Sequence, residues 1–145
     1  MKKLIFGMIA ALTVTGVMAA DAVNWQTDAV KAQAQAQAEN KLVMLDFTGS
    51  DWCGWCIKLK KEVFSQPEFA TYAKQNLVCV EVDFPMKKKL SAEQTKANDA
   101  LAAKYNIKGY PTIIVLNGEG KQVGTLGYMK GGPKAFTAAL DKLKK

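Results

Sequence analysis

The chain has 145 residues, 49% of them hydrophobic, and its 20 lysines and 13 acidic residues give a formal net charge of +7. That length and composition support one domain with its own hydrophobic core, and three cysteines are too few for a disulfide framework. Arginine and histidine are both absent, which argues against a nucleic-acid partner and excludes histidine-based catalysis and histidine metal ligands.

Residues 1–20 have the pattern of a secretory signal peptide. A lysine pair at positions 2 and 3 precedes an apolar stretch over residues 4–17, and small residues follow at Ala19 and Ala20. A positive start, a short apolar core and a small-residue exit are typical of a cleaved leader, with an uncleaved membrane anchor as the alternative. We therefore expect residues 1–20 to be a signal peptide, residues 21–145 to form one domain, and the protein to be secreted into the periplasm.

Residues 25–83 predict alternating helices and strands. The segment 25–40 is rich in Ala and Gln, which are good helix formers and poor strand formers, so it favours a helix. Apolar runs and Pro67, which suits the first turn of a helix, define the next elements: a strand over 42–47, a helix from Cys53 to Phe64, a helix over 67–75 and a strand over 77–83. Strand, helix and strand in this order predict a parallel crossover.

The second half of the chain predicts a loop, a helix, a β-hairpin and a C-terminal helix. Ser91 has the sequence context of an N-cap with Gln94 as its capping-box partner, and residues 117–120 are typical of a hairpin turn. The expected elements are a loop over 84–90, a helix over 91–105, strands over 112–116 and 121–126, and a helix over 134–144.

The segment Trp52-Cys53-Gly54-Trp55-Cys56 lies between the first predicted strand and the helix that follows it. A thiol at a helix start faces unpaired backbone N–H groups and the positive end of the helix dipole, and both favour the reactive thiolate. One helical turn brings the two sulfurs together, so we interpret the pair as redox-active, with a structural disulfide or half of a zinc site as alternatives. We expect Cys53 to attack a substrate and Cys56 to resolve the mixed disulfide.

Asp46 lies inside an apolar strand. Burial of a carboxylate without a partner raises its pKa, and such a group is suited to accept a proton when Cys56 must become a thiolate. We therefore expect Asp46 to be catalytic, with a strand cap or an ion pair with Lys58 as the alternative.

Two further features allow a structural and a functional interpretation. Cys79 lies in a Val-rich strand and predicts a small buried hydrophobe, with a second redox role as the alternative. The run Lys87-Lys88-Lys89 predicts a solvated loop, or else a docking patch for an acidic partner.

The order of these elements, together with Asp46-Phe47, the segment 52–56 and Tyr110-Pro111-Thr112, resembles the thioredoxin-like superfamily over residues 40–128. Within it, the chain is most similar to the periplasmic C-terminal thioredoxin domain of DsbD and to single-domain secreted thioredoxin-like proteins. The resemblance implies an α/β thioredoxin fold with a central mixed four-stranded sheet flanked by helices. A departure is the pair Gly54-Trp55 between the cysteines, where thioredoxin has Gly-Pro.

The resemblance also implies a substrate-binding surface around the cysteines. A cis peptide bond at Tyr110–Pro111 would hold the Tyr110 backbone against Cys53, where an extended substrate can pair with it; the alternative is a trans proline at a strand start. The side chains expected to contact substrate are those of Trp52, Trp55, Tyr110 and Pro111.

The sequence and the resemblance together predict a monomeric thiol–disulfide oxidoreductase without bound cofactor or metal. Its expected partners are cysteine-containing proteins, with a membrane thiol reductant carrier as a further candidate. The absence of histidine between the cysteines, the charge of Asp51 near Cys53 and the buried Asp46 all favour a reducing direction. The alternative is a binding module on the same scaffold, a chaperone or a copper carrier that uses the thiols of Cys53 and Cys56.

Overall fold

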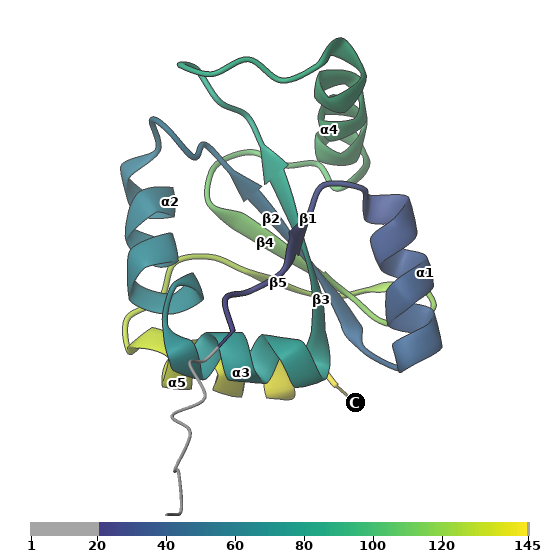
Figure 1. Cartoon of the computed structure of the whole chain (residues 1–145), viewed down its shortest axis with the longest axis vertical. Helices are drawn as coiled ribbons and strands as arrows, with labels where there is room; N and C mark the ends of the chain where they lie inside the picture. The colour runs from purple at the N-terminus through teal and green to yellow at the C-terminus, as the bar shows by residue number, and fades with distance from the viewer. Residues whose placement is uncertain (1–20, 145) are drawn as a thin grey trace, which may run out of the picture.

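The computed structural model describes residues 21–144, so the signal peptide predicted over residues 1–20 lies outside the described part of the chain. A mixed sheet in the order β1-β3-β2-β4-β5 forms the middle layer (Figure 1). Its strands are β1 (Trp25–Gln26), β2 (Leu42–Thr48), β3 (Leu77–Asp83), β4 (Thr112–Leu116) and β5 (Gln122–Leu126). β2 and β3 are parallel, and β4 is antiparallel to both β2 and β5. The predicted parallel crossover and C-terminal hairpin are therefore confirmed.

Helices cover both faces of the sheet (Figure 1). One face carries α1 (Ala29–Glu39) and α4 (Ala92–Lys104). The other face carries α2 (Gly54–Leu59), its π-helical continuation η1 (Lys60–Phe64), α3 (Pro67–Asn76) and α5 (Gly132–Asp141). Within residues 21–144, no helix has the length and hydrophobicity needed to cross a bilayer.

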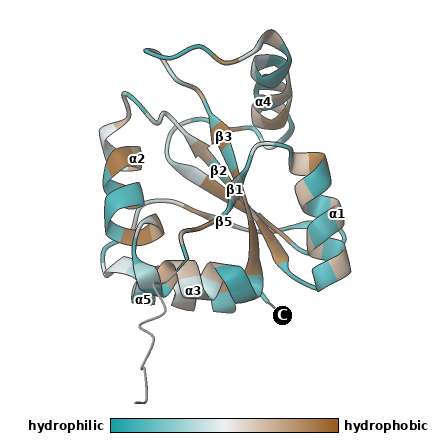
Figure 2. Cartoon of the chain, viewed as in Figure 1, coloured by the Kyte–Doolittle hydropathy of each residue, from teal (hydrophilic) through white to brown (hydrophobic). Residues whose placement is uncertain are grey.

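The central strand β2 is buried along its whole length, and it divides the hydrophobic core into two clusters. Successive side chains of a strand point to opposite faces, so Met44 packs under α3 and α5 while Val43 and Leu45 pack under α1 and α4. Figure 2 shows the strands as the most hydrophobic part of the chain. Because the core holds β2 on both sides, the loop after it delivers the cysteine segment to a fixed position.

The predicted four-stranded sheet is wrong by one strand, and the helix predicted over 25–40 begins late. Trp25 and Gln26 pair in parallel with Cys79 and Val80 of β3, and the Trp25 ring packs edge-on to Phe64 at 5.4 Å. Asp28 then starts α1, because its carboxylate accepts the backbone N–H groups of the first helical turn. A two-residue strand leaves no periodic pattern in the sequence.

Two predictions about helix ends also need correction. Ser91 caps α4 by accepting the Gln94 backbone N–H at 3.1 Å, but the Gln94 side chain does not return to Ser91. It donates instead to the Thr27 carbonyl and to Asn98, so the capping box is only half formed. The last helix spans Gly132–Asp141 and not 134–144.

Candidate active site

Cys53 and Cys56 form a disulfide at the start of α2, with their Cα atoms 5.2 Å apart. Cys53 is the N-cap residue of α2, and Cys56 lies in its first turn. The exposed fractions of the two residues are 7% and 5%, so exposure does not separate them. Their positions relative to the helix end distinguish them more clearly.

A backbone donor points at the Cys53 sulfur. The Cys56 N–H donates to Cys53 Sγ with an N···S distance of 3.2 Å. A hydrogen bond to the charged form of a group favours that form, so this N–H would stabilise a Cys53 thiolate once the disulfide is reduced. No equivalent donor to Cys56 Sγ occurs among residues 21–144. This asymmetry favours Cys53 as the thiolate.

Asp46 lies on the face of β2 that α2 covers, and it is 7% exposed. Its Oδ1 has no hydrogen-bond partner among the described residues. Burial, with a smaller contribution from the charge of Glu81, raises the pKa of Asp46 to about 8, and the charge of Lys60 opposes the shift. Asp46 lies within β2 and not at its end, so it does not cap the strand. Lys58 pairs with Glu62 at 3.9 Å and not with Asp46.

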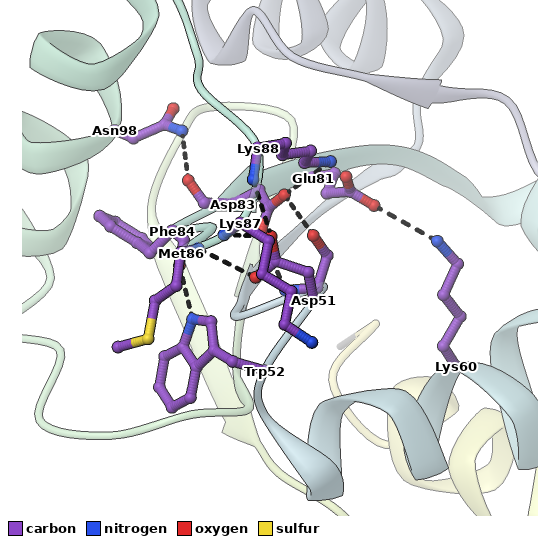
Figure 3. Close-up of polar contacts among 11 residues, drawn as sticks. Asp51, Trp52, Lys60, Glu81, Asp83, Phe84, Met86, Lys87, Lys88 and Asn98 are labelled. Atoms are coloured by element: carbon purple, nitrogen blue, oxygen red, sulfur yellow. Dashed lines mark hydrogen bonds and ion pairs between the residues drawn. The ribbon is translucent and has the colours of Figure 1, made fainter.

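Three charged side chains that sequence reasoning missed surround Asp46. In the register of the sheet Asp46 lies beside Glu81, and Asp83 follows two residues later on the same face. The Lys60 ammonium, from η1, lies 3.8 Å from the Glu81 carboxylate (Figure 3). The alternation of acidic residues along β3 was the available signal, but their proximity to Asp46 depends on strand register, which the sequence leaves open.

The loop before Cys53 is bonded to the loop after β3 (Figure 3). Asp83 accepts the Ser50 backbone N–H at 2.9 Å and also the Ser50 hydroxyl, while Trp52 donates its ring N–H to the Phe84 carbonyl at 2.7 Å. Asp51 accepts three backbone N–H groups from residues 86–88 at 2.8–3.1 Å. The first of these, from Met86, is the main cause that lowers the pKa of Asp51. The main contacts of the Asp51 carboxylate are therefore with the backbone of residues 86–88, and these contacts hold the loop.

Two clusters of aromatic side chains include Trp52 and Trp55, the chain neighbours of the cysteines. Trp52, 39% exposed, meets the Tyr110 ring edge-on at 5.8 Å, and Tyr110 contacts Phe84 at 5.3 Å. The Tyr110–Pro111 peptide bond is cis. Sequence analysis named Trp52 and Tyr110 but missed Phe84.

The second aromatic cluster lies on α2 and the segment after β5. Trp55, 57% exposed, packs on Tyr128 with 4.9 Å between ring centroids. The Lys58 ammonium lies over both rings at 5.1 and 5.2 Å, and the Tyr128 hydroxyl donates to Glu62 at 2.7 Å. Tyr128 carried no signal in the sequence, because the contact joins segments far apart in the chain.

Cys79 is buried in β3 and is not disulfide-bonded. Burial, with a smaller contribution from the charge of Asp46, raises the pKa of the Cys79 thiol to about 12. A thiol needs its thiolate form to attack a disulfide, so the structure favours the buried-hydrophobe interpretation of Cys79. Within residues 21–144, no three His, Cys, Asp or Glu side chains lie close enough together to hold a metal ion.

Comparisons with known proteins agree with this geometry. The family model of the thioredoxin-like domain matches residues 29–144. The chain is 36% identical over 131 residues to the disulfide bond reductase DsbH of Chlamydia pneumoniae. This match covers 90% of the chain and 78% of that protein. It is 34% identical over 91 residues to the thiol:disulfide interchange protein DsbD of Cronobacter sakazakii, but this match covers 63% of the chain and 14% of DsbD.

A solved structure described as DsbH oxidoreductase superposes on the chain with a TM-score of 0.84 at 34% identity, and the match covers 93% of each chain. The similarity therefore extends over the whole domain and includes both the sheet and the cysteine segment.

Replacement of Asp46 by Asn should change how stability depends on pH. Because the pKa of Asp46 is about 8 in the folded protein and about 3.9 in an unfolded chain, the folded state binds a proton between these values that the unfolded state releases. The free energy of unfolding of the oxidised protein should therefore fall as pH rises from about 4 to about 8 and then level off. Asp46→Asn should flatten this slope and stabilise the protein by roughly 2–5 kcal/mol at pH 8.

Urea unfolding of the oxidised protein at several pH values measures this effect. Asp99→Asn, at an exposed position on α4, is the matched control and should keep the wild-type slope. An Asp46→Asn protein with the same slope as wild type would show that Asp46 is already charged at neutral pH.

Proposed function

The chain belongs to the thioredoxin-like family, and from this premise we propose that it is a thiol–disulfide oxidoreductase that exchanges disulfides through Cys53 and Cys56. The observation that carries this proposal is the combination at the start of α2. There a disulfide has one sulfur bonded to a backbone N–H, and a carboxyl group without a hydrogen-bond partner at its Oδ1 atom lies on the sheet face below the helix.

The exchange proceeds in two steps from the dithiol form. The Cys53 thiolate, held by the Cys56 N–H, attacks a sulfur of the substrate disulfide; a mixed disulfide forms and the first substrate thiol leaves. Cys56 then loses its proton and attacks Cys53 Sγ, which releases the second substrate thiol and leaves the protein as a disulfide. Two electrons pass from the protein to the substrate.

Asp46 is suited to take the proton that Cys56 loses in the second step. With a pKa of about 8 in the disulfide form, its carboxyl group is mostly protonated at neutral pH, which is the state that follows such a transfer. An acceptor whose pKa lies near the operating pH is effective in both directions. Glu81 and Lys60 are positioning residues, because their charges shift the pKa of Asp46.

The proposed direction is reduction of substrate disulfides. Its supports are the buried acid on the sheet face that α2 covers, the absence of histidine between the cysteines, and the similarity to a relative whose name is disulfide bond reductase. Asp51 contributes less than its sequence position suggested, because its carboxylate is bonded to backbone N–H groups of residues 86–88.

The proposed setting is the periplasm, which rests on the signal-peptide pattern of residues 1–20. The substrates would be cysteine-containing proteins of that compartment, and a membrane thiol reductant carrier would restore the dithiol form. The protein would act as a monomer. The side chains proposed to contact substrate are those of Trp52, Trp55, Tyr110 and Pro111.

Alkylation of the reduced protein tests the assignment of the nucleophile. Because the Cys56 N–H supports the Cys53 thiolate, iodoacetamide near neutral pH should label Cys53 first, and Cys79 should resist labelling until the protein unfolds. Peptide mapping by mass spectrometry identifies the labelled residue. Cys56→Ser should accumulate a mixed disulfide with substrate, whereas first labelling at Cys56 or Cys79 would refute the assignment.

Equilibration with glutathione buffers tests the direction. The reduction potential should lie nearer to that of thioredoxin, about −270 mV, than to that of the strong oxidant DsbA, about −120 mV. The double variant Cys53→Ser/Cys56→Ser is the blank. A potential at the oxidising end would make the protein a disulfide donor, and stoichiometric copper binding without exchange activity would favour the binding-module alternative.

A further inference from the structure

A groove of about 500 Å³ is lined in part by Trp52, the residue that precedes Cys53. Its apolar lining comes from the loop before Cys53, the loop after β3 and the loop before β4. It consists of Trp52, Phe84, Pro85, Met86, Leu90 and Tyr110. Met86 is 74% exposed. The groove therefore continues the aromatic surface beside Cys53 into a region that the exchange chemistry does not use.

The wall of this groove is held in place before any partner binds. Residues 84–90 lie between β3 and α4 (Figure 1). The Asp51 carboxylate binds three of their backbone N–H groups, and Asn98 donates to the Asp83 carbonyl at 2.9 Å (Figure 3). A preformed surface avoids the entropy cost of ordering a loop on binding.

The rim of the groove is positively charged. Lys87, Lys88 and Lys89 are all exposed, and Lys88 and Lys89 line the groove. Lys88 is paired with Asp83 at 3.0 Å. Lys87 and Lys89 take part in no ion pair among residues 21–144. The two nearby acids already have partners. Asp83 accepts a hydrogen bond from Ser50 and pairs with Lys88, and Asp51 accepts hydrogen bonds from the loop backbone.

We propose that this groove binds an acidic and apolar segment that flanks the reacting cysteine of the partner protein. The inference rests on the proposed function, because the partner disulfide that reaches Cys53 brings its neighbouring residues onto Trp52 and Tyr110. An apolar side chain of that segment packs against Met86 and Leu90, while its carboxylates meet Lys87 and Lys89. Complementary charge of this kind speeds encounter and sets partner choice.

Single-turnover kinetics with matched peptides tests the proposal. The probes are three synthetic peptides, each with one cysteine in a mixed disulfide with 2-mercaptoethanol and a leucine nearby, that differ only in flanking Glu, Gln or Lys residues. The pre-reduced full protein should react with the Glu peptide about three- to tenfold faster than with the Gln peptide at low ionic strength. The Lys peptide should react slowest, and salt should reduce the differences.

The double variant Lys87→Gln/Lys89→Gln should lose the preference for the Glu peptide. The loop should survive this change, because Asp51 binds its backbone and not these side chains. The matched control is Lys134→Gln/Lys142→Gln, which removes two exposed charges on and after α5, away from the groove (Figure 1), and should keep the preference. Met86→Ser should slow the Glu and Gln peptides equally.

Hydroxyethyl disulfide, which has no flanking residues, separates this proposal from the proposed function. All variants should reduce it at the wild-type rate; failure of the wild-type protein to reduce it would refute the proposed function itself. Reduction of hydroxyethyl disulfide without any preference among the peptides would overturn the docking proposal alone. So would self-association in sedimentation that Lys87→Gln/Lys89→Gln abolishes, because the groove would then bind a second copy of this chain.

Discussion

The electrostatics of the candidate site centre on one buried acid whose Oδ1 atom lacks a hydrogen-bond partner. Asp46 occupies a fully buried strand between two hydrophobic clusters, and its Oδ1 atom has no partner among the described residues. An uncompensated charge in such a place is costly, and the side chain avoids that cost by keeping its proton. In the mechanism we propose, this cost in stability is the consequence of placing a proton acceptor for Cys56 on the sheet face that α2 covers. The charge of Glu81 raises the pKa of Asp46, and the charge of Lys60 lowers it.

A second constraint links the disulfide to the surface beside it. Ser50, Asp51 and Trp52, which lead into Cys53, each bond to Asp83 or to the loop that follows it. The position of the cysteines and the shape of the groove are therefore set by the same contacts. A change that broke the bonds between the Asp51 carboxylate and the backbone of residues 86–88 would disturb the approach to Cys53 as well as the groove.

The features that depend on local sequence could be predicted, and those that depend on contacts between distant segments could not. The apolar run around Asp46, the spacing of Cys53 and Cys56 and the hairpin after β4 all leave local patterns, and the α/β architecture follows from their order. Strand β1 is too short for a pattern. Phe84 and Tyr128 join the site only through tertiary contacts, and the role of Asp51 depends on a loop 35 residues away along the chain.

Asp46 should carry a proton at neutral pH when the disulfide is formed, because burial raises its pKa. Carbon-13 NMR of the oxidised protein labelled at aspartate carboxyl carbons measures this directly, with the Asp46 signal assigned by its absence from the Asp46→Asn spectrum. This signal should titrate with a midpoint near pH 8, since the pKa of Asp46 is raised to about 8. A midpoint below about pH 5, within the ordinary range for aspartate, would contradict it.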